Sequence, residues 1–362
     1  MRIAQVSPLW EKVPPPGYGG IELVVGHLTD ELCRRGHHVT LFASGDSQTL
    51  ADLDAVCPQA LRLDPNVIEP HAYHILQYKR VLEQANEFDI IHFHMGYPAL
   101  PYAEMMTTAV VHTLHNGFNP ESHEVFRQYR NQNYISISDA QQQRVPELNF
   151  VETIHNGIAI EDYPFVETPA TDPPYLAFLG RFSPEKGPHH AIEIAKRTGW
   201  TLKMAGKIDR VDRCYFDEQI FPHIDGTQIQ YHGELSHGDK AKLLGYATAS
   251  LFPITWDEPF GLVSIESMCT GTPVIAFGRG AVPEIIVQGT TGFICNTLEE
   301  MVAAVSQVTT LNRQASRDLV SRGFSVSSMV EKYEAAYQQV LDERWSQNGH
   351  RVTTASPLVV VS

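Results

Sequence analysis

The first half of the chain alternates short apolar runs with longer amphipathic segments. An apolar run at 2–6 precedes a loop rich in Pro and Gly, and apolar residues then recur at helical spacing over 21–32 before Gly36 ends the predicted helix. Further strands are predicted at 38–43, 89–94, 109–113 and 134–138. Strands that alternate with helices predict a parallel sheet covered by helices on both faces.

The alternation of apolar runs and amphipathic segments begins again after a proline-rich segment. Four prolines lie between positions 164 and 174, among acidic and threonine residues, which predicts a linker. The second half has predicted strands at 175–180, 202–205, 229–232, 249–252 and 272–277, a helix at 191–198 and a long final helix at 327–345. We therefore predict an α/β protein with two doubly wound domains, at 1–166 and 167–326, facing a cleft, with a tail at 346–362.

Composition narrows the class of partner. The 362 residues are 43% hydrophobic and 19% charged, as in ordinary folded, soluble proteins. The net charge of −15 argues against nucleic acid as a partner and allows at most peripheral membrane contact. Five scattered cysteines without CxxC spacing, no secretory signal and no apolar run near the roughly 20 residues that span a bilayer predict a cytoplasmic protein.

The most informative segment is 258–266, which lies between the predicted strands at 249–252 and 272–277. Glu258 follows the first strand, and Glu266 lies in the short helix that comes next. Ligands of open α/β sheets bind at this edge, and free amides at the helix start favour a phosphate. Carboxylates accept hydrogen bonds from sugar hydroxyls. The combination indicates either a ligand with both phosphate and sugar or two surface acids beside an ordinary helix.

Other segments supply complementary groups at the predicted cleft. Gly19 and Gly20 join the first strand to the first helix and allow close backbone approach to an anion. Arg181 and Lys186 follow the strand at 175–180 and could neutralise a diphosphate. A plain glycine turn and a solvated charged loop are the alternatives. The Gly-rich turn at 278–284 either closes the cleft near a nucleotide or is a simple turn.

Two patterns could be mistaken for metal sites. His92 and His94 face the same side of a predicted strand, but no third ligand lies near them in the sequence. The DxD pattern at 52–54 has no apolar strand ending beside it. We therefore predict no essential metal and no cofactor. His115, in the loop after the strand at 109–113, is the best polar candidate to contact a sugar.

Taken in order, these motifs resemble family 4 retaining glycosyltransferases. The resemblance covers nearly the whole chain and includes the final helix. Its most specific element is the pair of glutamates separated by seven residues. The motifs are Gly19-Gly20, Thr113 with His115, Asn156-Gly157-Ile158, Gly180-Arg181 with Lys186-Gly187, and Glu258 to Glu266.

The resemblance implies a GT-B fold, with two Rossmann-like domains facing a cleft and the last helix crossing back to the first domain. It implies a nucleotide-sugar donor held mostly by the second domain and an acceptor held mostly by the first. Glu266 would hold the ribose, and Glu258 the donor sugar. The other implied donor-binding residues are Gly19, Gly20, Arg181, Lys186, Phe260, Gly261, Leu262 and Val263, and the implied catalytic residues are His115, Arg181, Lys186 and Glu258.

The expected activity is transfer of a hexose with retention of configuration and without a metal. UDP-glucose is the expected donor, from resemblance to bacterial polysaccharide-assembling members, and the expected acceptor is a saccharide or lipid-linked saccharide. Two other classes stay open. A nucleotide-sugar epimerase of the same architecture would convert the donor without an acceptor, and a non-catalytic nucleotide-sugar sensor would bind the donor without turnover.

Overall fold

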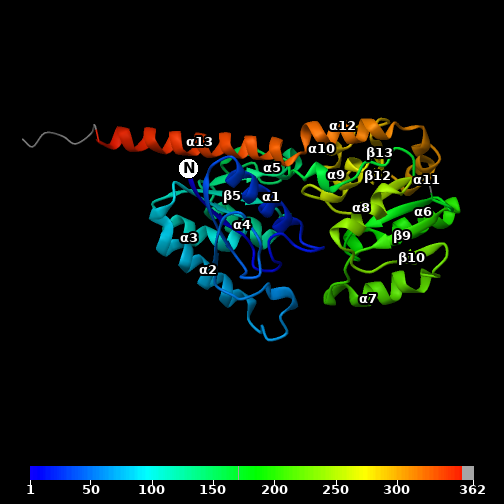
Figure 1. Ribbon diagram of the computed structural model, residues 1–362, viewed down its shortest axis with the longest axis horizontal. Coiled ribbons are helices and arrows are strands. Elements are labelled where there is room, and N and C mark those ends of the chain that lie inside the picture. Colours follow the sequence, from blue (N-terminus) through cyan, green and yellow to red (C-terminus); the bar gives the residue numbers. More distant parts are fainter. Residues whose placement is uncertain (170, 353–362) are drawn as a thin grey trace, which may run out of the picture.

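Two fully parallel sheets, each covered by helices on both faces, form the protein (Figure 1). The computed structural model describes residues 1–169 and 171–352. Its seven-stranded and six-stranded sheets lie in separate lobes that face each other. This confirms the prediction of an α/β protein with two doubly wound domains.

The first sheet has the strand order β3-β2-β1-β4-β5-β6-β7. Its central strands are buried on both faces, as parallel sheets between helices require. The strands are β1 (Arg2–Val6), β2 (His38–Ala43), β3 (Asp52–Ala55), β4 (Ile90–Phe93), β5 (Ala109–Leu114), β6 (Asn133–Ser136) and β7 (Phe150–Thr153). The helices are α1 (Gly20–Arg34), α2 (Pro70–Gln84), α3 (Leu100–Glu104), α4 (Pro120–Gln128) and α5 (Asp139–Gln143).

The second sheet repeats this plan in the order β10-β9-β8-β11-β12-β13. Its strands are β8 (Tyr175–Leu179), β9 (Thr201–Ala205), β10 (Ile229–Tyr231), β11 (Ala249–Phe252), β12 (Val274–Phe277) and β13 (Gly292–Cys295). The helices are α6 (Pro188–Thr198), α7 (Arg213–Tyr215), α8 (His237–Gly245), α9 (Leu262–Cys269), α10 (Val282–Ile285), α11 (Leu298–Val305) and α12 (Arg313–Gly323). A buried cluster that includes Phe178, Phe182 and Ile275 forms part of its core.

The strand order explains where the loops of interest meet. In each sheet the first three strands are added in one direction, and the chain then crosses back and adds the remaining strands on the other side of the first strand. The direction therefore reverses between β1 and β4 in the first sheet and between β8 and β11 in the second. Loops diverge at such switch points and leave a crevice at the carboxyl ends of the strands. The segments after β1, β8 and β11 carry Gly19–Gly20, Arg181–Lys186 and Glu258, so the topology directs them to the cleft.

Three short strands escaped prediction, namely β3, β7 and β13, which are all at sheet edges. Two of them, β3 and β7, are only partly buried and lack the continuous apolar run of the central strands. Strand β3 contains the DxD pattern and is mostly exposed. The pattern thus lies within a strand, although not an apolar one. The Asp54 carboxylate accepts hydrogen bonds from Arg80 and from Gln84, which gives it a structural role.

The final helix, α13 (Val326–Val352), leaves the second domain and runs along the first (Figure 1). Met329, Val330, Tyr333 and Tyr337 are buried in the same cluster as residues of β1, β5 and α1. The helix continues past the predicted end at 345, because no proline occurs before position 357 to stop it. The predicted tail therefore starts inside the helix, and 353–362 lie outside the described residues. In the part of the chain that the structure describes, no helix is long and apolar enough to cross a membrane.

Candidate functional site

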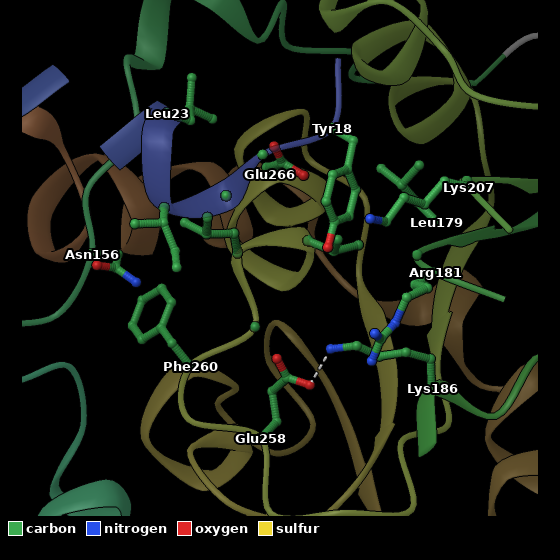
Figure 2. A pocket seen from close by; sticks show the side chains of 18 of the residues that line it. Tyr18, Leu23, Asn156, Leu179, Arg181, Lys186, Lys207, Glu258, Phe260 and Glu266 are labelled. Carbon is green, nitrogen blue, oxygen red and sulfur yellow. Dashed lines mark hydrogen bonds and ion pairs between the residues drawn. The ribbon is translucent and has the colours of Figure 1, made fainter. Parts of the chain in front are cut away.

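A cavity of about 390 Å³ lies between the two domains, at the carboxyl ends of both sheets. We call it the interdomain cavity. Figure 2 shows Arg181 and Lys186 projecting into it opposite Glu258, while Tyr18 and Glu266 lie at its other end. It is lined from the first domain by 17–21 and His115, and from the second by 179–181, 206–207 and 258–263.

Two helix starts meet in this cavity. A Cβ atom on Gly20, the first residue of α1, would lie 3.1 Å from Leu262 Cδ1 at the start of α9. Gly261 precedes α9 with φ of +94°, which only glycine adopts readily, and an added Cβ would lie 2.9 Å from the Phe252 ring. No side chain of the described residues caps either helix, so their first amide groups stay available to an anion.

Glu258 is held in place from three sides. Its Oε2 atom lies 2.5 Å from Lys186 Nζ and accepts a hydrogen bond of 2.7 Å from Trp256 Nε1. The main chain of Glu258 accepts from the Ala281 amide, and a Cβ on Gly280 would collide with the Glu258 backbone. The turn at 278–284 therefore lies behind Glu258 as a support and does not line the interdomain cavity.

Cations line the opposite wall. Arg181 pairs with Glu185 and lies 3.5 Å from Asp209, and Lys186 follows in the same loop. Lys207 pairs with Asp209 at 2.9 Å and lies 3.7 Å from the centre of the Tyr18 ring, so a cation–π contact joins the two domains (Figure 2). Each cation already has an acidic partner, which keeps the charges in place without a ligand.

Glu266 lies at the other end of the cavity and is only 3% exposed. Its Oε1 atom accepts a hydrogen bond of 2.8 Å from the Tyr163 hydroxyl and lies 3.6 Å from Lys240 Nζ. Lys240 also donates to the Gly17 carbonyl in the first domain. Glu266 is thus fixed in orientation by Tyr163 and Lys240, and Lys240 links it to the first domain.

His115 ends a buried chain of hydrogen bonds that starts on the last helix. His115 Nε2 lies 2.9 Å from His94 Nδ1, and His94 Nε2 lies 2.8 Å from Gln5 Oε1. Gln5 Nε2 donates to the Tyr337 hydroxyl, which also contacts His92 Nδ1 at 2.7 Å. Burial lowers the pKa of His115 to about 3, so this imidazole is neutral.

The chain of hydrogen bonds also assigns the proton positions. With the Gln5 amide as oriented, Gln5 Oε1 accepts from His94 Nε2–H. Neutral His94 must then accept at Nδ1, so His115 donates from Nε2–H and keeps Nδ1 as an acceptor. Both ring nitrogens of His92 are also engaged, by Tyr337 and Thr113, which leaves none for a metal.

A second cavity, of about 520 Å³, opens beside the first and extends over helix α2. We call it the α2 cavity. The two cavities share Asn116 and the loop at 18–21. The α2 cavity is lined by Pro8, Trp10, Glu11, Tyr18, Gly19, Gly20, Ile21, Glu22, His71, His74, Ile75, Tyr78, His94, Met95, Pro98, Tyr102 and Asn116.

The structure brings all the predicted site residues to the wall of the interdomain cavity: Gly19, Gly20, His115, Arg181, Lys186, Glu258, Phe260, Gly261, Leu262, Val263 and Glu266. Phe260 is 2% exposed and belongs mainly to the core. Sequence reasoning missed Lys207, Lys240 and Trp256. Gly206-Lys207 follows β9 and could have been found by the rule that located Arg181, whereas Lys240 reaches the cavity only through the packing of α8.

Comparison with known proteins fits this geometry. Residues 18–162 match the family described as Glycosyltransferase Family 4, and residues 159–324 match the one described as Glycosyl transferases group 1. The glycogen synthase of Mycobacterium tuberculosis is 27% identical, over 85% of this chain and 86% of its own.

Solved structures share the fold at lower identity. Sucrose-phosphate synthase from Thermosynechococcus elongatus superposes with a TM-score of 0.78 at 18% identity, over 95% of this chain and all of its own. HepE from Anabaena, solved in complex with UDP and glucose, superposes with a TM-score of 0.73 at 18% identity, over 93% of this chain and 99% of its own.

The fold and these matches together identify a glycosyltransferase of the GT-B fold that acts on nucleotide sugars. Within that class, the chain belongs to the family 4 type of glycosyltransferases.

We predict that Tyr337→Phe lowers the free energy of unfolding by roughly 1–3 kcal/mol, because it leaves two buried atoms, Gln5 Nε2 and His92 Nδ1, without their hydrogen-bond partner. Urea denaturation measures the change. Tyr333→Phe is the matched control, since among the described residues its hydroxyl hydrogen-bonds to Thr113, and Thr113 keeps its bond to His92. Equal decreases in the free energy of unfolding for the two variants would contradict the chain of hydrogen bonds.

Stability should also depend on pH through Glu22, which lines the α2 cavity. Burial raises the pKa of its carboxyl from 4.5 to about 7, and the Glu11 charge adds to this. The folded state then holds the proton more tightly than the unfolded state, so the free energy of unfolding falls as pH rises from about 4.5 to 7. Over this pH range we expect the free energy of unfolding of Glu22→Gln to decrease by about 3 kcal/mol less than that of the wild type.

Urea denaturation at pH 5 and pH 8 measures the difference between wild type and variant. Glu83→Gln, at a side chain that is 57% exposed, is the control and should leave the pH dependence unchanged. A Glu22→Gln variant with the pH dependence of the wild type would rule out Glu22 as its source.

Proposed function

We propose that the protein is a retaining hexosyltransferase that moves glucose from UDP-glucose to a saccharide or lipid-linked saccharide in polysaccharide biosynthesis. One observation carries the proposal: Arg181, Lys186 and the free amides of α9 converge opposite Glu258 in one cavity. A diphosphate held by the cations would lie next to a sugar held by Glu258, since Lys186 and Glu258 are in contact. The names of the glycogen synthase relative and of HepE, solved with UDP and glucose, support glucose and UDP as first choices.

Each group has a role that its surroundings suit. Arg181, Lys186 and the amides of Leu262 and Val263 would bind the diphosphate, and Lys207 adds a cation that the sequence did not reveal. Glu258 would accept hydrogen bonds from hydroxyls of the donor sugar. Glu266, oriented by Tyr163, would hold the ribose hydroxyls.

The remaining groups serve the first-domain side of the donor. Gly19 and Gly20 would let the α1 start approach the distal phosphate, because neither glycine carries a side chain there. His115 would contact the donor sugar near its reacting face, with Nδ1 as an acceptor for a hydroxyl proton.

The reaction follows from where charge develops. The bond between the anomeric carbon and the phosphate oxygen breaks, and the diphosphate leaves with the bonding electrons. Fixed cations and amides stabilise this charge without reorganising during the step. The acceptor oxygen forms its bond to the anomeric carbon from the same face, and its proton goes to the leaving phosphate oxygen. The proposed reaction needs no metal ion, since protein groups supply the positive charge.

The test is a panel of nucleotide sugars, incubated with the protein and a chelator while nucleotide release is followed with and without saccharide acceptors. We expect release from UDP-glucose, and a product that keeps the anomeric configuration of the donor. Binding without release would identify a sensor. Conversion of the donor without release would identify an epimerase. Loss of activity with the chelator would overturn metal independence.

We predict that Lys186→Ala lowers kcat by at least ~10²-fold, the size of loss seen when one transition-state donor is removed. Lys186 is the cation that contacts Glu258, so the diphosphate loses a positioned charge. Initial rates of transfer measure the effect. Lys242→Ala, at a side chain that is 72% exposed, serves as control. Turnover near the wild-type value in Lys186→Ala would remove Lys186 from the proposed site.

A further inference from the structure

The α2 cavity is continuous with the interdomain cavity but has different chemistry. The interdomain cavity is lined by Arg181, Lys186, Lys207 and Lys240. Of the described residues that line the α2 cavity, none is Lys or Arg. Its charged lining consists of two carboxyl groups, from Glu11 and Glu22, which are 3% and 5% exposed.

Two cations lie beside the α2 cavity, and both are already engaged. Lys207 lies over the Tyr18 ring and pairs with Asp209 at 2.9 Å. Arg62 forms an ion pair with Glu11 and lies 3.5 Å from Glu234, so its charge is shared between two acids. His74 adds no positive charge near neutral pH, because burial lowers the pKa of its imidazole. A phosphate in this cavity would therefore face two buried carboxyl groups, while Arg62 and Lys207 are already paired with acids.

The rest of the lining suits a sugar ring. Trp10, Tyr18 and Tyr102 supply aromatic surface, and the Trp10 side chain is 42% exposed and so available to a ligand. Sugar rings have apolar C–H faces that pack on aromatic rings and hydroxyl edges that donate to carboxylates. His74 Nε2 is buried and has no hydrogen-bond partner within the described ranges, which leaves a polar atom for a hydroxyl. Binding pockets combine such apolar walls with a few polar groups.

We propose that the α2 cavity binds an uncharged sugar unit as the acceptor and excludes a sugar that carries a phosphate on that unit. The proposal rests on the proposed function and narrows its acceptor class. The cavity joins the donor site at Asn116 and the loop at 18–21, so a sugar bound there can direct a hydroxyl toward the reacting carbon.

The first experiment measures binding without donor, and is therefore independent of transfer. Ligand-observed NMR at pH 8 compares matched pairs of probes, glucose with glucose 6-phosphate and maltose with maltose 1-phosphate. We expect saturation transfer to the uncharged member of a pair and at least ~10-fold weaker binding of its phosphorylated partner. Equal or tighter binding of the phosphorylated sugars would overturn the proposal, as would no binding of any probe.

Two variants locate the binding. Trp10→Ala should reduce binding of the uncharged sugars at least ~10-fold, because it removes the exposed aromatic wall. Trp345→Ala, at a 77% exposed side chain on α13, should leave binding unchanged. Unchanged sugar binding in Trp10→Ala would place the acceptor elsewhere.

A charge placed in the α2 cavity tests the basis of the exclusion. Ile75 lines the cavity from α2 and is 54% exposed, so Ile75→Lys can add a cation without disturbing the core. The next residue, Leu76, is 50% exposed but does not line the cavity, which makes Leu76→Lys the matched control. Ile75→Lys should improve binding of the phosphorylated probes several-fold. An equal gain in both variants would mean that the overall charge of the protein, and not the charge inside this cavity, determines how well the phosphorylated probes bind.

Discussion

The meeting of two uncapped helix starts is the constraint on which the rest of the cleft depends. Helices α1 and α9 come from different domains, and Gly20 and Leu262 bring their first turns into contact. The positive ends of two helix dipoles repel each other unless negative charge lies between them. The cavity therefore favours an anion, and the acids that pair with its cations balance their charge in the absence of a ligand.

The contacts that join the two domains also shape the site. Lys240 touches both Glu266 and the Gly17 carbonyl, and Lys207 lies on the Tyr18 ring. Helix α13 joins the domains covalently and anchors Tyr337 beneath the first sheet. Because Tyr337 is linked through Gln5 and His94 to His115, the orientation of a group in the cleft depends on a helix that does not line it.

Much of the architecture could be predicted because parallel strands between helices are apolar throughout. The central strands stood out for this reason, and the strand ends then located Arg181, Lys186 and Glu258. Edge strands such as β3 lack this signal, because their exposed positions carry polar residues. Lys240 could not be predicted either, because its place depends on how α8 packs across the cleft and not on neighbours in the sequence.

The two cavities have few lining residues in common, and this has an evolutionary consequence. They share Asn116 and one short loop, and otherwise draw on separate sets of side chains. Substitutions on the exposed face of α2 can therefore accumulate without changing most of the lining of the interdomain cavity. Under the proposed assignment of acceptor and donor to the two cavities, such substitutions would change the acceptor while the donor stays the same, and recombination of the α2 region between relatives would yield new products.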